Sequence, residues 1–276
     1  MEKTLDAAGV TIPRLGIGTF QMAGDVCVGA VTGGIAAGFR HIDTAEMYGN
    51  EVEVGEGIRA SGVPREDLFV TTKVWHENLA EGRLQQAAEG SLKRLGLNQV
   101  DLFLIHWPSA SVPLDESVKA LASVKSSGLA RAVGVSNFPV RLLNEAVARS
   151  PEPLAVNQVE YHPFLRQDAV LDAVRANAMA LTAYCPLARA TVVDNPVVRD
   201  IAGRHGVDPA VVALSWLLSQ DRVMAIPKSR SPERLAAALT AHDLVLTAAE
   251  RDTLSALAHP NGRMVKPAFA PQWDAA

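Results

Sequence analysis

Eight short apolar runs, separated by longer segments with helical periodicity, constrain the fold of this chain more than any other feature. Several runs, such as VDLFLIH at residues 100–106, are almost continuously apolar instead of alternating. A strand of that kind is buried on both faces, as in a parallel sheet covered by helices. The predicted strands are residues 15–18, 40–44, 68–74, 100–106, 132–136, 155–160, 180–185 and 224–227.

Helix signals fill the intervals between the runs. An apolar stripe at helical spacing extends from Leu84 to Leu95, and Gly96 follows it as a typical stop. Asn50 and Glu53 have the spacing of a capping box at the start of another helix. Each strand is therefore followed by a helix.

Eight such units predict a closed (β/α)8 TIM barrel, an α/β fold, in preference to an open sheet. An open doubly wound sheet would carry GxGxxG after its first strand, but Gln21 stands where the third glycine is required. A short N-terminal hairpin at residues 4–12 is predicted before the barrel, and a C-terminal helix at 247–258 with a loose tail after it. No linker or change in composition divides the chain, so residues 1–276 are expected to form a single domain.

The composition fits a globular protein and disfavours several functional classes. Of 276 residues, 48% are hydrophobic, and a formal net charge of −4 offers no global basic field for nucleic acid or anionic membranes. We find neither a signal peptide nor an apolar stretch of membrane-spanning length. Two cysteines, Cys27 and Cys185, cannot form a disulfide framework. We therefore expect a soluble, cytoplasmic protein with no nucleic-acid or membrane partner.

Polar residues recur where the predicted strands end. The carboxyl ends of parallel barrel strands face one side, where such folds place their active sites. Each residue also has an ordinary interpretation: Asp43 can cap a turn, Lys73 can extend to solvent, and His106 can be a neutral core histidine. Their coincidence on one rim favours a functional site. The residues are Asp43, Lys73, His106, Ser136, Asn137, Gln158, Tyr184, Lys228 and Ser229.

Three of these residues can converge with Tyr48, which lies in the loop after the strand that carries Asp43. A phenol with a reference pKa of ~10 is a poor acid at neutral pH. A neighbouring Lys73 ammonium would lower that pKa, and Asp43 would hold the ammonium charged and in place. The set predicts a site that reduces a carbonyl, in which Tyr48 donates the proton and His106 orients the carbonyl oxygen.

Three ordered segments resemble signatures of the aldo-keto reductase family. Residues 38–55 (GFRHIDTAEMYGNEVEVG) match the first signature in every specified position, 131–138 (RAVGVSNF) match the second, and 226–234 (IPKSRSPER) match most of the third. The resemblance implies a (β/α)8 barrel that binds a nicotinamide cofactor without a Rossmann fold. It also implies a catalytic tetrad, with Tyr48 as general acid, formed by Asp43, Tyr48, Lys73 and His106.

The same resemblance implies a site for NADPH. The residues implied at its nicotinamide end, where Tyr184 would stack on the ring, are Ser136, Asn137, Gln158 and Tyr184, and Leu187 is a further expected cofactor contact. Those implied at the adenosine 2′-phosphate are Lys228, Ser229 and Arg234, with Arg230 as a further positive group. A solvated basic turn at a helix start is the alternative interpretation of this segment. The family usually has polar side chains near the adenine where this chain has Ala237 and Ala238, so weaker cofactor binding is expected.

Within the family, the chain looks most similar to the bacterial 2,5-diketo-D-gluconate reductases of the B type. That resemblance implies small carbonyl substrates, including methylglyoxal, other α-dicarbonyls and β-keto esters. Short predicted connections after His106 and Tyr184 indicate an open pocket suited to small polar carbonyls. The residues expected to line it, with ordinary core packing as the alternative for the first and third, are Phe20, Met47, Trp75, Trp107 and Trp273.

Two other functions remain open from the sequence. The protein can be a non-catalytic, NADPH-binding regulatory subunit, because a fold does not prove turnover. Alternatively, Lys73 can be the Schiff-base nucleophile of a lyase, although that role needs a depressed lysine pKa. No metal site is expected, since the HExxH pattern fails after His76 and Glu77. Nothing in the sequence indicates a self-complementary surface, so we expect a monomer.

Overall fold

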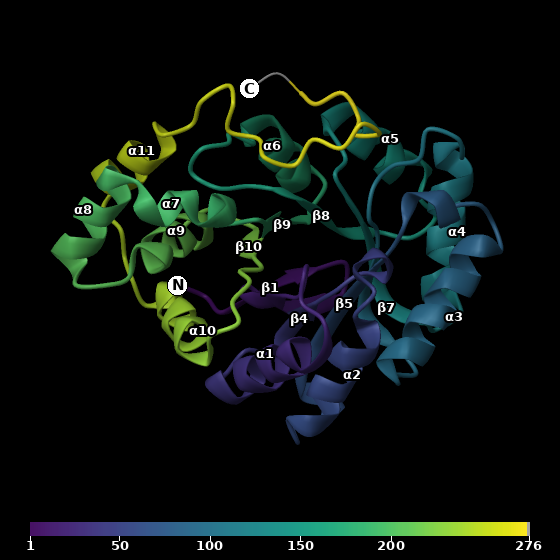
Figure 1. The fold of residues 1–276 in the computed structure, drawn as a ribbon. Helices are drawn as coiled ribbons and strands as arrows, with labels where there is room; N and C mark the ends of the chain where they lie inside the picture. Colours follow the sequence, from purple (N-terminus) through teal and green to yellow (C-terminus); the bar gives the residue numbers. More distant parts are fainter. Residues whose placement is uncertain (275–276) are drawn as a thin grey trace.

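The computed structural model, which describes residues 1–274, contains one eight-stranded parallel sheet with the order β10-β9-β8-β7-β6-β5-β4-β3 (Figure 1). Each strand therefore pairs with its predecessor in the barrel. All eight predicted strands are present, as β3 (Gly16–Gly18), β4 (His41–Asp43), β5 (Phe69–Val74), β6 (Val100–Ile105), β7 (Ala130–Ser136), β8 (Leu154–Glu160), β9 (Ala180–Tyr184) and β10 (Val223–Ala225).

The sheet closes on itself between β10 and β3. The backbone N–H of Ala225 donates to the Arg14 carbonyl at 2.9 Å, and that of Gly18 donates to the Pro227 carbonyl at 3.0 Å. The Arg14 guanidinium adds bonds across the same seam, to the carbonyls of Leu218 at 2.6 Å and Val223 at 3.0 Å. The predicted (β/α)8 barrel is confirmed.

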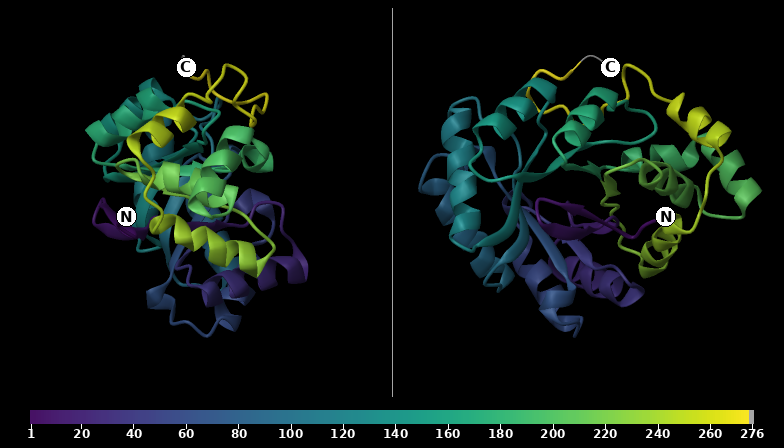
Figure 2. Two further views of the ribbon diagram at one scale, coloured as in Figure 1. Left: turned by 90° about the vertical axis from the view of Figure 1, so that its left-hand side faces the viewer. Right: turned by 180° about the vertical axis from the view of Figure 1, so that it is seen from behind.

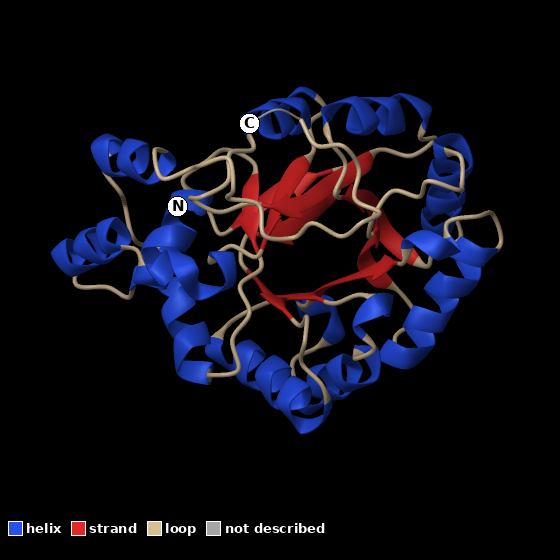
Figure 3. Ribbon diagram, turned by 45° about the horizontal axis from the view of Figure 1, so that its top comes forward, coloured by secondary structure: helices blue, strands red, loops and turns tan. Residues whose placement is uncertain are grey.

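Helices surround the strands on the outside of the barrel (Figures 2 and 3). The largest apolar cluster lies between this layer and the sheet. The helices are α1 (Gly24–Ala37), α2 (Glu51–Ala60), α3 (Arg83–Leu95), α4 (Leu114–Ser126), α5 (Val140–Arg149), α6 (Asp168–Ala176), α7 (Thr191–Asp194), α8 (Pro196–His205), α9 (Pro209–Leu218), α10 (Pro232–Leu239) and α11 (Ala248–Ser255). Short 3-10 turns are η1 (Glu46–Tyr48), η2 (Arg65–Asp67), η3 (His76–Asn78), η4 (Ala188–Ala190) and η5 (Thr240–His242).

The predicted hairpin is also present, as β1 (Thr4–Ala7) paired with β2 (Val10–Pro13). Its buried side chains belong to a second apolar cluster inside the barrel, with Phe69, Ala180 and other residues from the strands. Phe69 and Ala180 are the first residues of β5 and β9, so the hairpin packs at the amino ends of the strands. The opposite end of the barrel carries the polar residues predicted from the sequence.

The predicted apolar stripe is confirmed in α3, where Leu84, Leu92 and Leu95 are buried and Gly96 takes a left-handed conformation. The predicted capping box at Asn50 is wrong. The Asn50 side chain makes no cap bond; its amide donates to the carbonyls of Thr19 at 2.8 Å and Met22 at 2.9 Å. Because Asn50 is fully buried, these loop carbonyls compete successfully with the helix end for the amide.

The fit between α2 and α3 depends on Gly55, and we expect Gly55→Ala to destabilise the protein. A Cβ there would lie 2.1 Å from the Leu95 carbonyl oxygen. Because that oxygen belongs to the backbone, it cannot move away without shifting the end of α3. Such overpacking lowers the free energy of unfolding by about 1–3 kcal/mol or more. Gly29→Ala, in α1 with nothing within 4 Å of the added methyl, is the matched control. It should stabilise the protein by up to about 1 kcal/mol, and equal effects of the two changes on urea unfolding would contradict this packing.

Candidate active site

A buried ion pair stands at the carboxyl end of β4 and β5. The Lys73 side chain is 0% exposed, and its Nζ donates to Asp43 Oδ1 at 2.5 Å and to the Thr44 carbonyl at 2.7 Å. Burial lowers the pKa of Lys73, and the Asp43 carboxylate opposes that shift. The interpretation of Lys73 as a solvent-exposed side chain is therefore wrong.

Tyr48 lies next to this pair, at the end of η1. Its hydroxyl is 3.5 Å from Lys73 Nζ. Burial, reinforced by the Asp43 charge, raises the pKa of Tyr48 well above its ordinary value. The expectation of a lowered Tyr48 pKa is wrong, because loss of hydration and the Asp43 charge both raise it. The phenol therefore keeps its proton at neutral pH.

Glu46, at the first position of η1, holds this turn in place and was missed by sequence reasoning. Its two carboxylate oxygens accept from the Trp75 backbone N–H at 2.8 Å and from the Asn78 side-chain amide at 2.9 Å. Glu46 thereby ties the turn that carries Tyr48 to the loop after β5. Glu46 belongs to no recognisable sequence motif, so its role in holding the Tyr48 turn is seen only in the folded structure.

His106 follows β6 and completes the group of four. Its ring centroid lies 5.5 Å from that of Tyr48 and 5.3 Å from that of Trp75, in edge-on arrangements. Burial lowers the pKa of His106 well below its ordinary value, and Lys73 and His76 lower it further. The imidazole is thus neutral, and its covered Nδ1 has no hydrogen-bond partner among residues 1–274. The structure brings all four predicted catalytic residues together.

Amide and hydroxyl groups from β7, β8 and β9 join the same rim. Gln158 Nε2 donates to Asp43 Oδ2 at 2.7 Å, across the barrel. Asn137 donates to the His106 carbonyl at 2.9 Å and accepts from the Tyr184 hydroxyl at 2.8 Å. Ser136 Oγ donates to the Gln158 carbonyl at 2.7 Å. These four predicted residues form one hydrogen-bonded set that adjoins the ion pair.

The predicted phosphate segment lies after β10 and leads into α10. Lys228, Arg230 and Arg234 are exposed and form no ion pair within the described part of the chain. Ser231 caps the helix by accepting from the Arg234 N–H at 3.2 Å. Partial loss of hydration along its side chain, followed by the Arg230 charge, lowers the pKa of Lys228 although the residue is exposed. Cations that repel one another beside a helix N-terminus suit a bound anion.

The remaining predicted cofactor positions lie in different surroundings. Leu187, in the loop after β9, is half-buried against the main apolar cluster. Ser229 Oγ accepts from the Ser231 N–H at 3.1 Å and so shapes the turn before α10. Ala238, one of the two alanines expected near the adenine, is 6% exposed and belongs to the core. Ala237, by contrast, is half-buried.

Aromatic side chains stand around the tetrad. Phe20 is 45% exposed with its ring centroid 5.0 Å from that of Tyr48, and Met47 is 41% exposed beside it. Ordinary core packing is therefore excluded for Phe20. Trp107 is buried, and Trp273 of the C-terminal tail lies against it with ring centroids 6.2 Å apart.

Sequence reasoning missed Phe269, which also belongs to the tail. Its ring centroid lies 5.5 Å from that of Trp75, 5.6 Å from that of Trp107 and 4.3 Å from that of His76. Figure 1 shows the tail passing across the top of the molecule toward α5. The tail has no helical or strand periodicity, so its sequence does not reveal that Phe269 packs near the strand ends.

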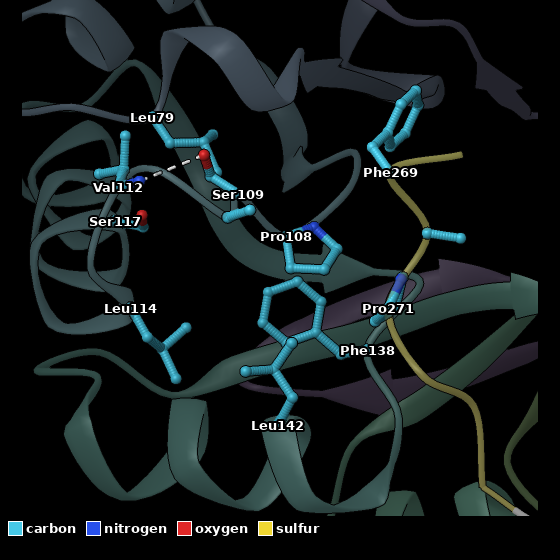
Figure 4. Close-up of a pocket in the computed structure, with 12 residues that line it drawn as sticks. Leu79, Pro108, Ser109, Val112, Leu114, Ser117, Phe138, Leu142, Phe269 and Pro271 are labelled. Atoms are coloured by element: carbon cyan, nitrogen blue, oxygen red, sulfur yellow. Dashed lines mark hydrogen bonds between the residues drawn. The ribbon is translucent and has the colours of Figure 1, made fainter. Parts of the chain in front are cut away.

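A pocket of about 250 Å³, open to solvent, adjoins the loop that follows His106, and none of the four tetrad residues lines it. It is enclosed by the loop after β6, the start of α5 and the tail (Figure 4). Pro108, Phe138, Leu142 and Phe269 give it largely apolar walls. The tail therefore supplies a wall that the short predicted loops alone would not provide.

Comparison with known proteins agrees with this geometry. Residues 14–259 match the model of the Aldo/keto reductase family. The chain belongs to this family. This aldo/keto reductase is 40% identical over 269 residues to methylglyoxal reductase DkgB of Salmonella typhimurium, covering 96% of this chain and 100% of the relative. It is likewise 40% identical to morphine 6-dehydrogenase of Pseudomonas putida, covering 90% of this chain and 88% of that enzyme.

Solved structures show the same relationship. A protein provisionally assigned as a 2,5-diketo-D-gluconic acid reductase B superposes with a TM-score of 0.97 at 43% identity, covering 100% of this reductase and 98% of that chain. A Bombyx mori aldo-keto reductase in complex with NADP superposes with a TM-score of 0.89 at 30% identity, covering 96% and 94%. The protein is an oxidoreductase of a carbonyl-reducing family.

Two kinds of feature are absent from the described residues. Within residues 1–274, no three His, Cys, Asp or Glu side chains are grouped so that they could hold a metal ion. Over the same residues, every helix is too short or too polar to cross a bilayer.

Among substitutions at this site, those that break the Asp43–Lys73 ion pair should lower the free energy of unfolding most. Asp43→Asn leaves the Lys73 ammonium buried without a counter-charge, which should lower the free energy of unfolding by about 3–5 kcal/mol. Adding Lys73→Met removes the stranded charge and should recover at least half of that loss. Urea unfolding of the single and double variants measures both effects. A double variant as unstable as Asp43→Asn would show that the unpaired charge is not the cause.

Proposed function

We propose that this reductase uses NADPH to convert small aldehydes and ketones into alcohols, with Tyr48 as the proton donor. The substrates proposed are α-dicarbonyls such as methylglyoxal, keto-sugar acids such as 2,5-diketo-D-gluconate, and β-keto esters. The observation that carries the proposal is the Tyr48 hydroxyl, 3.5 Å from the Lys73 ammonium and beside the neutral His106. The names of the methylglyoxal and diketogluconate reductase relatives support the substrate classes.

The tetrad suits proton delivery to a carbonyl oxygen. When bound, the nicotinamide supplies the hydride for the carbonyl carbon. The Tyr48 hydroxyl gives its proton to the oxygen as negative charge develops there, and the Lys73 ammonium stabilises the phenolate that remains. Asp43 fixes the position of Lys73, and neutral His106 orients the carbonyl oxygen through a hydrogen bond. Before the next turnover the phenolate must take up a proton from solvent, which the raised pKa of Tyr48 favours.

The donor set of the chain fits an NADPH cofactor. Guanidinium and ammonium groups without acidic partners suit the dianionic 2′-phosphate, which NADH lacks. We assign that role to Lys228, Ser229, Arg230 and Arg234. The Tyr184 ring, half-buried and held through its hydroxyl by Asn137, suits stacking on the nicotinamide. The groups proposed at that end are Ser136, Asn137, Gln158 and Tyr184, with Leu187 as a further contact to the cofactor.

The Schiff-base alternative has one observation for it and a stronger one against it. Burial does lower the pKa of Lys73, as a nucleophilic amine requires. However, Lys73 Nζ is 0% exposed and is bonded to Asp43 and the Thr44 carbonyl, so no substrate carbon can reach it. Reduction is the chemistry that this arrangement favours.

Tyr48→Phe tests the proton donor. We expect kcat to fall by about 10²–10⁴-fold, because general acid catalysis is lost while the ring remains. The Kd of NADPH should change by less than about twofold, since only transition-state stabilisation is removed. Tyr161→Phe removes a buried hydroxyl that donates to Gln220 and is the matched control, with kcat retained. Turnover of methylglyoxal that survives Tyr48→Phe would refute the mechanism.

Arg234→Ala tests the choice of cofactor. Loss of a charge-assisted contact to the 2′-phosphate should raise the Kd of NADPH by about 10–100-fold. The Kd of NADH should stay within about twofold, because NADH lacks that phosphate. Lys119→Ala, which removes an exposed cation from α4, is the control. Fluorescence titration with both cofactors measures the constants, and equal weakening would count against the assignment.

A further inference from the structure

Glu46 joins two turns at the mouth of the barrel. The turn η1 ends in the proposed proton donor, Tyr48, and η3 directly follows Trp75. Glu46 Oε2 accepts from the Trp75 backbone N–H at 2.8 Å, and Oε1 accepts from the Asn78 side-chain amide at 2.9 Å. Because the Asn78 backbone N–H donates to the Trp75 carbonyl at 3.0 Å, one carboxylate holds both ends of η3.

The Trp75 N–H needs this acceptor because the neighbouring strand has already ended. β4 stops at Asp43, whereas β5 continues to Val74. The Val74 carbonyl accepts from the His106 N–H on the β6 side, so the next N–H, that of Trp75, faces the side of β4. A backbone donor without an acceptor is costly in a partly buried position. Glu46 supplies an oxygen where a longer β4 would supply a carbonyl.

The other side chains of η1 attach it only weakly. Met47 is 41% exposed. Within residues 1–274, the Tyr48 hydroxyl has one hydrogen-bond partner, Lys73 Nζ, at the long distance of 3.5 Å. Phe20, which packs on the Tyr48 ring, is itself 45% exposed. These contacts leave much of the placement of the phenol to the turn that carries it, and Glu46 fastens that turn to the end of β5.

The other end of the bridge bears on the proposed catalytic histidine. The Trp75 ring centroid lies 5.3 Å from that of His106. In the proposed reaction, Tyr48 and His106 must both reach one carbonyl oxygen within hydrogen-bond distance. Glu46 links the turn that carries the first group to the residue packed against the second. One side chain thereby helps to set their relative position.

A carboxylate is the group that suits this bridge. Both partners are N–H donors, and an ionised carboxylate offers two oxygens with no competing donor. An amide has a single acceptor oxygen, which can still take the Trp75 N–H. Its N–H2 group would then face Asn78, which can turn its own amide and accept from it. Glutamine should therefore replace Glu46 with little loss, whereas an apolar side chain of similar length should not.

We infer that Glu46 is a positioning residue for the reduction: it places the Tyr48 hydroxyl relative to Lys73 and His106 without touching the substrate. This inference rests on the proposed function and deepens it. Because Glu46 acts through the geometry of proton transfer, its effect falls on kcat and leaves cofactor affinity unchanged.

Glu46→Leu removes both acceptors and keeps much of the side-chain volume. We expect kcat for methylglyoxal to fall about 10–100-fold, because the proton donor is misplaced, while the Kd of NADPH changes by less than about twofold. Glu46→Gln should keep kcat within about threefold of the wild type, since the bridge can be rebuilt.

Glu116→Leu is the matched control. Glu116 is half-buried in α4 and accepts from the Glu81 backbone N–H at 3.0 Å, so it holds the same β5–α3 connection at a point after η3. Its replacement should leave kcat within about twofold of the wild type. Equal losses of kcat in Glu46→Leu and Glu116→Leu would overturn the inference, because general loosening of that connection would then explain both.

A measurement without substrate or cofactor separates this inference from the proposed function. The chain has three tyrosines, so protein labelled with 3-fluorotyrosine can be assigned by ¹⁹F NMR with Tyr48→Phe and Tyr161→Phe. Glu46→Leu should shift or broaden the Tyr48 resonance and leave that of Tyr161 in place. Glu46→Gln should restore the Tyr48 resonance to near its original position, and Glu116→Leu should move neither.

A Tyr48 resonance that stays in place in Glu46→Leu would overturn the inference, and so would a kcat within about twofold of the wild type. Turnover that is lost only in Tyr48→Phe would then leave the proposed function intact. If the wild type reduces none of the proposed substrates, the proposed function fails, and the resonance still decides whether Glu46 places Tyr48. If Glu46→Leu does not fold, Asn78→Ala removes one of the two bonds and must move the same resonance.

Discussion

Closure of eight parallel strands into a ring is the constraint on which the site depends. Parallel pairing sends the carboxyl end of every strand to one mouth, so residues far apart in the chain meet there. Gln158 and Asp43 are separated by 115 positions and share a hydrogen bond of 2.7 Å. Lys73, from a third strand, is held by Asp43 and the Thr44 carbonyl. A buried ammonium is tolerated because each of these acceptors is rigidly supplied by the barrel.

The mouth has two structural layers with different tasks. The strand ends hold the tetrad, whose partners are buried and whose geometry the sheet determines. The tail then crosses the mouth and adds Phe269 and Trp273, anchored through Glu160. The proposed chemistry belongs to the strand ends, and the tail contributes Phe269 to the wall of the adjoining pocket. Such an arrangement lets the specificity of a barrel change in an aperiodic segment without disturbing the buried ion pair.

The sequence predicted the barrel well because its signals are local. Continuous apolar runs such as residues 100–106 are typical of strands covered on both faces, and the stripe from Leu84 to Leu95 predicts a helix from its own spacing. The capping role of Asn50 was also predicted from local spacing, and that prediction was wrong. The amide prefers carbonyls of the loop after β3, which are distant in sequence and close in space. The predicted direction of the Tyr48 pKa shift was wrong for a similar reason, since burial and the Asp43 charge raise that pKa.

The amino-acid sequence by itself determined the strand count, the order of the units, the hairpin, and which polar residues end each strand. Those properties follow from periodicity and position along the chain. The tertiary structure alone decided how Asp43, Tyr48, Lys73 and His106 are hydrated and how the tail meets the mouth. Hydration depends on everything packed around a group, and residues 259–274 have no periodicity from which their contacts could be read. The roles of Glu46 and Phe269 therefore became visible only in the folded chain.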